Sequence, residues 1–169
     1  MRSERTSTKG RQEEEMAKKD VPIENVKDYV GEEISVSDWF EVDQERVNQF
    51  AECTMDPQWI HTDVEKAKAG PFGGTIAHGL LSISFIPSFL TNNMKFNMTG
   101  YSMFINYGFD KIRFLTPVTV GSRIRIRFLL TEFTDKGSGR FLLRLPCTFE
   151  LEGSEKPACV AEFLAMFVK

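Results

Sequence analysis

A strict alternation of apolar and charged residues in the last third of the chain is the strongest constraint on its fold. In SRIRIRFLL, residues 122–130, isoleucine and phenylalanine alternate with arginine. A period of two places apolar side chains on one face of an extended strand and charged ones on the other. FLLRLPCTFEL, residues 141–151, repeats the signal, and DKGSG at 135–139 supplies turn residues between them. We therefore predict a hairpin in an antiparallel sheet with one solvent-facing side.

A buried helix and further strands complete the predicted fold. Residues 159–168 are apolar enough for a central strand, and YSMFINY at 101–107 begins another. The segment TIAHGLLSISFIPSFL is apolar on nearly every side, which predicts a helix over 76–90 that is buried all round. Pro87 should kink or end it. The pattern predicts an α+β fold, in which an antiparallel sheet packs on one buried helix.

The first half of the chain predicts shorter elements. A strand is expected around residues 34–36, and Asp43 can cap a helix that ends near Thr54. The segment MDPQWIHTD, residues 55–63, is expected to be irregular because proline and tryptophan interrupt any simple period. The glycines and proline between residues 70 and 74 predict a loop.

Composition limits the classes of protein to which the chain can belong. It has 169 residues, is 41% hydrophobic and carries 21 basic against 24 acidic residues. We expect a disordered tail over residues 1–20 and a single domain over 21–169. The charge balance argues against nucleic-acid binding, and no apolar stretch is long enough to span a membrane. The N-terminus lacks the apolar core of a secretory signal, and three cysteines without metal spacing indicate reduced thiols, so we expect a cytoplasmic protein.

Asp56 and His61 are the first candidates for chemistry. They lie five residues apart in the predicted loop. A carboxylate and an imidazole that converge on one water can act as base and acid, and apolar neighbours shift pKa values toward the working pH. The alternative is that Asp56 caps a turn and His61 is a structural loop histidine.

The glycines around the start of the predicted helix are the second candidate. Gly79 can leave its N–H accessible, so that this group and the helix end could stabilise an oxyanion. Equally, Gly79 could serve only close helix–sheet packing. His78 is interpreted as a buried, paired structural ring, and no serine lies in a nucleophile elbow. The basic stripe Arg123, Arg125 and Arg127 is expected to face solvent, with contact to substrate phosphates as the alternative.

Two segments resemble the MaoC-like dehydratases, also called hydratase-2 type (R)-specific enoyl-CoA hydratases. These are DPQWIH at 56–61, followed by GPFGGTIAHGLL at 70–81, and they look closest to the nodulation protein N-like branch. The likeness covers roughly residues 25–169 and includes INYGFDKIRFLTPVTVGSRIR. It implies a hot-dog fold, with a long antiparallel sheet wrapped around a central helix, and a homodimer.

The resemblance also implies roles for individual residues. Asp56 would take the position of the aspartate that activates water, and His61 that of the histidine that manages the proton delivered to C2. Gly79 would match the glycine whose N–H polarises the thioester carbonyl. Asn106 and Arg113 are weaker candidates for substrate contact, with sheet packing and a surface charge as their alternatives.

This sequence departs from the family pattern at three positions. Gln58 and Trp59 replace an asparagine–proline pair, so Trp59 could narrow the pocket or redirect the loop. Pro87 falls where some hydratases carry a helpful serine.

The resulting prediction is a hydro-lyase that hydrates trans-2-enoyl-CoA, or the same thioester on an acyl carrier protein, to the (R)-3-hydroxyacyl product. It is expected to need no metal and no other cofactor. Two alternatives stay open, a hot-dog acyl-CoA thioesterase and a non-catalytic subunit that binds acyl thioesters.

Overall fold

A computed structural model describes residues 18–169 of the chain. The predicted tail, residues 1–20, lies almost wholly outside this range, and Asp20 opens the first strand. The helices are η1 (Ile23–Tyr29, a 3-10 helix), α1 (Gln44–Thr54), α2 (Trp59–Thr62), α3 (Val64–Lys68), α4 (Gly79–Ser84) and α5 (Ile86–Asn92). The strands are β1 (Asp20–Pro22), β2 (Glu33–Val36), β3 (Phe40–Glu41), β4 (Asn97–Thr99), β5 (Met103–Phe114), β6 (Arg123–Leu129), β7 (Glu132–Gly137), β8 (Arg140–Leu151) and β9 (Cys159–Val168).

A seven-stranded sheet forms the body of the molecule. Its main path runs β2-β6-β8-β9-β5, with β3 paired to β6 and β7 paired to β8. Every pairing in this sheet is antiparallel, as predicted. β9 lies between β8 and β5, which confirms that residues 159–168 form an interior strand. β5 lies at the end of the path, so one of its two edges has no neighbouring strand among the described residues.

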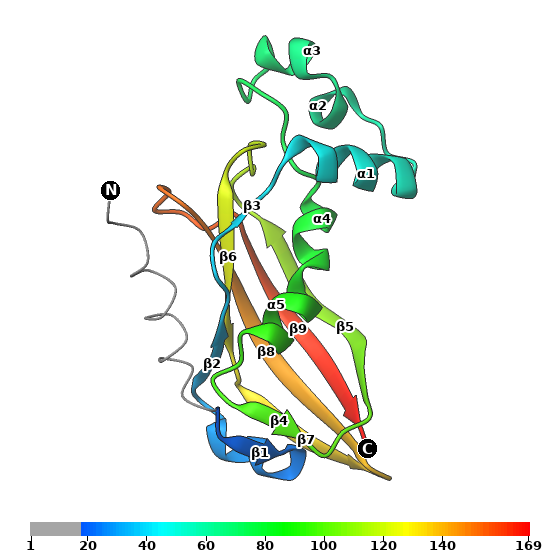
Figure 1. Cartoon of the computed structure of the whole chain (residues 1–169), viewed down its shortest axis with the longest axis vertical. Helices are drawn as coiled ribbons and strands as arrows, with labels where there is room; N and C mark the ends of the chain where they lie inside the picture. The colour runs from blue at the N-terminus through cyan, green and yellow to red at the C-terminus, as the bar shows by residue number, and fades with distance from the viewer. Residues whose placement is uncertain (1–17) are drawn as a thin grey trace, which may run out of the picture.

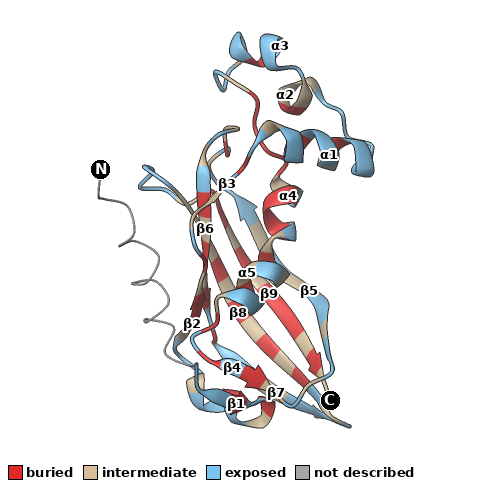
Figure 2. Cartoon of the chain, viewed as in Figure 1, coloured by how far each residue is buried: buried red, intermediate tan, exposed pale blue. Residues whose placement is uncertain are grey.

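The alternating segments bury the predicted residues. Ile124, Ile126 and Phe128 of β6 are fully buried, and Phe141, Leu143, Leu145 and Phe149 of β8 join them in the core. Figure 2 shows the resulting alternation of buried and less buried positions along β8 and β9. On the opposite face, Arg125 and Arg127 both bond Glu150 of β8, at 2.5 Å and 2.7 Å. These ion pairs neutralise the charges of Arg125 and Arg127 on the sheet surface. They favour a role in holding the strands together over binding of substrate phosphates.

The prediction that one turn joins residues 122–130 directly to 141–151 is wrong. The two segments do pair, as β6 and β8, but the turn at Ser138 and Gly139 joins β7 to β8. β6 pairs with the second half of β8 and β7 with its first half. An additional strand, β7, therefore lies in the chain between the two alternating segments. Ser138 and Gly139 both have positive φ angles, 54° and 71°, which suits a tight hairpin turn.

The central helix is shorter and less buried than predicted. Ile76 and Ala77 are extended, because Ala77 N–H bonds the Val118 carbonyl at 2.8 Å, so the helix begins at Gly79 and not at 76. The helical path divides into α4 and α5 near Pro87, which confirms the predicted kink. The prediction of burial on all sides is wrong. The sheet covers only one side of the two helices, and Leu80 is 65% exposed on the other.

The two helices cross the face of the sheet, and α1, α2 and α3 project beyond one end of it (Figure 1). Asp43 caps α1 by accepting a bond from the Arg46 N–H at 2.8 Å, and the helix ends at Thr54, both as predicted. The segment predicted to be irregular contains the single turn of α2. An antiparallel sheet packed against a central helix is the hot-dog fold that the resemblance implied. Among the described residues, no helix has the length and apolarity needed to cross a membrane.

Candidate active site

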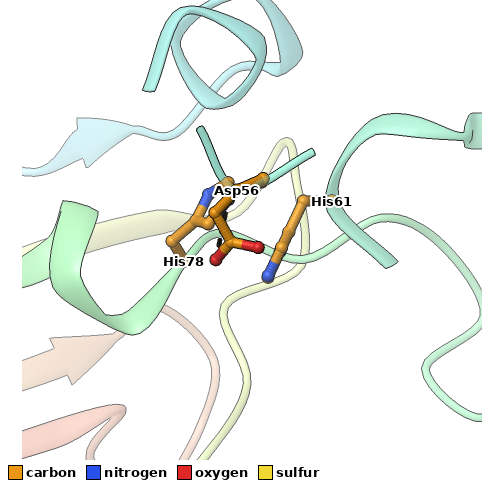
Figure 3. Close-up of side chains that lie close together, drawn as sticks. All are labelled: Asp56, His61 and His78. Carbon is orange, nitrogen blue, oxygen red and sulfur yellow. Dashed lines mark hydrogen bonds and ion pairs between the residues drawn. The ribbon is translucent and has the colours of Figure 1, made fainter. Parts of the chain in front are cut away.

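The structure brings Asp56 and His61 together at the junction of the projecting helices and the sheet. Met55, the residue that follows α1, has the left-handed conformation, with a φ angle of 58°, which turns the chain sharply. The Asp56 N–H then bonds back to the Ala51 carbonyl at 2.9 Å. The turn of α2 places His61 beside this loop, and the two side chains face each other together with His78 (Figure 3). One imidazole nitrogen from each histidine and one carboxylate oxygen of Asp56 lie within 4.8 Å of one another.

His61 is held in one orientation by a main-chain carbonyl. The side chain is buried, with 8% of its surface exposed, and its Nδ1 lies 2.7 Å from the Ile76 carbonyl oxygen. A carbonyl only accepts hydrogen bonds, so Nδ1 carries the hydrogen. In the neutral ring, Nε2 therefore presents a lone pair that can accept a proton.

Burial lowers the pKa of His61 below its ordinary value of 6.5. The bond to the Ile76 carbonyl and the Asp56 carboxylate oppose this shift, while the neighbouring His78 ring adds to it. The lowered pKa keeps His61 neutral at neutral pH, which is the form with a free lone pair on Nε2. The arrangement thus provides a base beside an exposed carboxylate.

His78 packs directly against this pair. Its ring stacks on His61 with centroids 3.7 Å apart, and its Nε2 bonds the Asp56 main-chain carbonyl at 3.0 Å. The same nitrogen lies 3.9 Å from a carboxylate oxygen of Asp56. The prediction of a buried, paired ring is confirmed for Nε2, whereas the buried Nδ1 has no hydrogen-bond partner within the described chain. His78 thus anchors the Asp56 loop to the start of α4.

A pocket of about 390 Å³ opens beside His61 and Gly79. Its walls are mainly apolar, which suits a hydrocarbon portion of a ligand. Asp56 is not part of the wall and reaches the pocket through its proximity to His61. Other lining residues include Leu80, Ser82, Phe114, Val118 and Cys159.

Gly79 is the first residue of α4, so its N–H has no acceptor within the helix. The Phe114 ring comes so close to Gly79 that a Cβ built there would lie 2.7 Å from it. Gly79 therefore makes the close packing contact that the sequence allowed, and its N–H lacks an intrahelical partner, as a donor to a ligand requires.

The remaining predicted residues lie away from this pocket. Asn106 lines a smaller apolar groove of about 280 Å³ between β5 and the central helices. Arg113 is exposed and bonds its neighbour's carbonyl, that of Ile112. The Trp59 ring packs against Gly70 and beneath the Lys66 ammonium group, so it does not narrow the pocket wall.

Asp56, His61 and His78 are also the described residues that are close enough together to hold a metal ion. His61 Nδ1 and His78 Nε2 already bond main-chain carbonyls, so the free nitrogens are His61 Nε2 and His78 Nδ1. A free imidazole nitrogen and a carboxylate this close to each other fit acid–base chemistry.

Known proteins with similar sequences and structures match most of the chain. The family model of the MaoC-like domain matches residues 25–141. The 3-hydroxyacyl-thioester dehydratase Z of Mycobacterium tuberculosis H37Rv is 46% identical over 138 residues, which cover 82% of this chain and 90% of that protein. Nodulation protein N of Rhizobium leguminosarum is 36% identical over 148 residues, covering 87% and 91%. The structure of a monoamine oxidase regulatory protein from Archaeoglobus fulgidus superposes with a TM-score of 0.74 at 26% identity, covering 91% and 98%.

Proposed function

The chain belongs to the MaoC-like dehydratase family, a family of hydro-lyases, and we propose that it reversibly hydrates trans-2-enoyl-CoA to (R)-3-hydroxyacyl-CoA. The observation that carries this proposal is the Asp56–His61 pair beside an apolar pocket with the Gly79 N–H in its wall. The dehydratase name of the 46%-identical relative supports an acyl-thioester substrate. The (R) configuration rests on the resemblance of the two sequence segments to the (R)-specific hydratases.

In the proposed reaction, one water is bound between Asp56 and His61. The pair takes one proton from this water as its oxygen bonds to C3 of the substrate. The Gly79 N–H stabilises the negative charge that develops on the thioester oxygen. The pair then returns one proton to C2, so the product differs from the substrate by one water. Dehydration is the same sequence in reverse.

The direct test is the absorbance of the enoyl-thioester band while the protein is mixed with crotonyl-CoA or a longer enoyl-CoA. We expect the absorbance to fall, and a chiral assay to identify the (R)-product. Release of free thiol from saturated acyl-CoA would instead indicate a thioesterase. Binding of crotonyl-CoA without turnover would indicate a binding subunit.

Gly79→Ala tests the role of the Gly79 N–H. We expect a loss of about 10²-fold or more in kcat/KM, because the new methyl group shields a donor in the oxyanion site. Adding Phe114→Ala removes the ring that the methyl group would meet, so the double variant should regain the thermal stability of Phe114→Ala alone but not its turnover. Full recovery of turnover in the double variant would show that Gly79 serves packing only.

We also propose a homodimer formed through the free edge of β5. Met103, Ile105 and Tyr107 alternate along this strand with exposures of 52%, 44% and 61%, and a long apolar edge favours pairing with a second chain. Replacing Ile105 and Tyr107 by lysine should therefore give a monomer in light scattering. Val30→Lys is the matched control, because Val30 is also 44% exposed but lies in the turn between η1 and β2, at the opposite end of the strand order from β5. A dimer in the lysine variant would contradict this interface.

Three further expectations stay proposals. The cytoplasmic location rests on the cysteine content. Asn106 and Arg113 remain candidates for contact with substrate. The carrier of the acyl group is coenzyme A or a carrier protein.

A further inference from the structure

The side chain of Gln44 joins three separate segments near His61. Its Nε2 donates to the His61 main-chain carbonyl at 2.7 Å and to Asn48 Oδ1 at 2.8 Å. Its Oε1 accepts from the Thr75 hydroxyl at 2.5 Å. Gln44 is the first residue of α1, so a single amide connects the start of α1 to α2 and to the segment that leads into α4.

The two segments that Gln44 connects are those whose contact orients the His61 ring. His61 Nδ1 donates to the Ile76 carbonyl, and the Ile76 N–H donates to the Ile60 carbonyl at 3.0 Å. Gln44 bonds His61 on one side of this contact and Thr75, the neighbour of Ile76, on the other. The Gln44 amide therefore fixes the distance between the His61 ring and the Ile76 carbonyl. This carbonyl determines the tautomer of His61.

The surroundings of Gln44 favour a fixed bridge. Thr75 is 4% exposed, and its own carbonyl accepts from the Val120 N–H at 2.8 Å, which ties this segment to the body of the protein. Both the donor and the acceptor function of the amide are occupied. An amide whose nitrogen and oxygen are both bonded has one orientation. It therefore holds α2 at a fixed position relative to the body of the protein.

We propose that Gln44 is a positioning residue that keeps His61 in the Nδ1–H tautomer, with the Nε2 lone pair directed at the reacting water. The relevance to turnover rests on the proposed hydration reaction, whereas the effect on the tautomer does not. In catalysis, a misplacement of about 1 Å can cost about 10²-fold in rate. Gln44 itself does not touch the reacting atoms.

Two variants separate the functions of the amide. Gln44→Met has nearly the same length and removes every hydrogen bond of the side chain. Gln44→Glu keeps an acceptor for Thr75 but places an oxygen against the His61 carbonyl, so it disturbs α2 through repulsion. Gln49→Met is the matched control, because Gln49 lies on the exposed face of the same helix and, within residues 18–169, its side chain bonds only that of Glu45.

The test is a long-range ¹H–¹⁵N spectrum of the imidazole rings, recorded on the folded protein without substrate. The chain has two histidines, so the spectrum contains two rings, and His61→Asn identifies the His61 signals. We expect a single Nδ1–H tautomer for His61 in the unchanged protein and in Gln49→Met. Gln44→Met and Gln44→Glu should show a mixture with the Nε2–H form. An unchanged His61 tautomer in both folded Gln44 variants would overturn the proposal.

Turnover provides the second measurement. Gln44→Met should lower kcat by about 10- to 10²-fold with little change in KM, since the pocket itself is intact. Should the unchanged protein hydrate no enoyl thioester, the proposed function fails, and the tautomer comparison still decides the role of Gln44. If Gln44→Met does not fold, Gln44→Glu gives the same spectrum-based decision.

Discussion

Asp56→Asn is expected to lower kcat for enoyl-CoA hydration by about 10²- to 10⁴-fold, the range typical of a lost acid–base group. The substitution keeps the size of the side chain and its ability to accept one hydrogen bond. It removes the negative charge that, in the proposed mechanism, orients and activates the water. The absorbance assay with crotonyl-CoA measures the loss directly, and KM should change little because Asp56 does not line the pocket wall.

The control for Asp56→Asn is Glu52→Gln, which neutralises an exposed carboxylate on the adjacent turn of α1. It should retain the turnover of the unchanged protein. Circular dichroism and light scattering should show that both variants are folded and have the same mass. A folded Asp56→Asn variant with undiminished turnover would remove Asp56 from the mechanism.

His61→Asn should produce a loss of similar size, about 10²- to 10⁴-fold in kcat. The asparagine amide can still donate to the Ile76 carbonyl in place of Nδ1, so the loop keeps its anchor. It provides no group at the position of Nε2, which is the proton-transferring atom in the proposed mechanism. His61→Gln is the comparison variant. Its amide reaches the position of Nε2 and can form hydrogen bonds there, but it cannot accept a proton as an imidazole does. The two variants together therefore separate proton transfer from hydrogen bonding. High turnover in both variants would contradict the role of His61.

The pH profile provides an independent readout for the same histidine. Protonated His61 has no lone pair on Nε2, so kcat/KM should fall as the pH drops through the pKa of His61 in the folded protein. Burial lowers this pKa, so the acid limb should lie below pH 6.5. The limb should be absent from the residual activity of His61→Asn.

Period-two alternation was sufficient to predict the sheet because it is a local property of the chain. The residues that alternate in β6 and β8 are the buried ones. β7 has no such pattern, since Thr134, Asp135 and Lys136 are polar in succession, and only its pairing with β8 makes it a strand. The start of the central helix was also missed, because Ala77 is drawn into an extended conformation by Val118, 41 residues away.

The predicted site residues differ in how far the sequence could place them. Asp56 and His61 are close in sequence and belong to a recognisable segment, so their proximity was predictable. The stacking of His78 on His61 and the bonds of Gln44 to His61 and Thr75 join residues 17 to 31 positions apart. Nothing in the local pattern distinguishes Gln44 from other polar residues of α1, and only the three-dimensional fold reveals its contacts.

Hydrogen bonds join α2 to residues 75–77, so the loop between these two segments can vary in length and sequence. Residues 71–73 lie in an exposed turn outside the contacts at Ile60, His61 and Gln44. Because both ends of this loop are fixed to the same framework, added residues would lengthen the loop without displacing the histidine ring. Evolution and engineering can therefore alter this loop, and any recognition of a substrate carrier that it provides, at little risk to the chemistry.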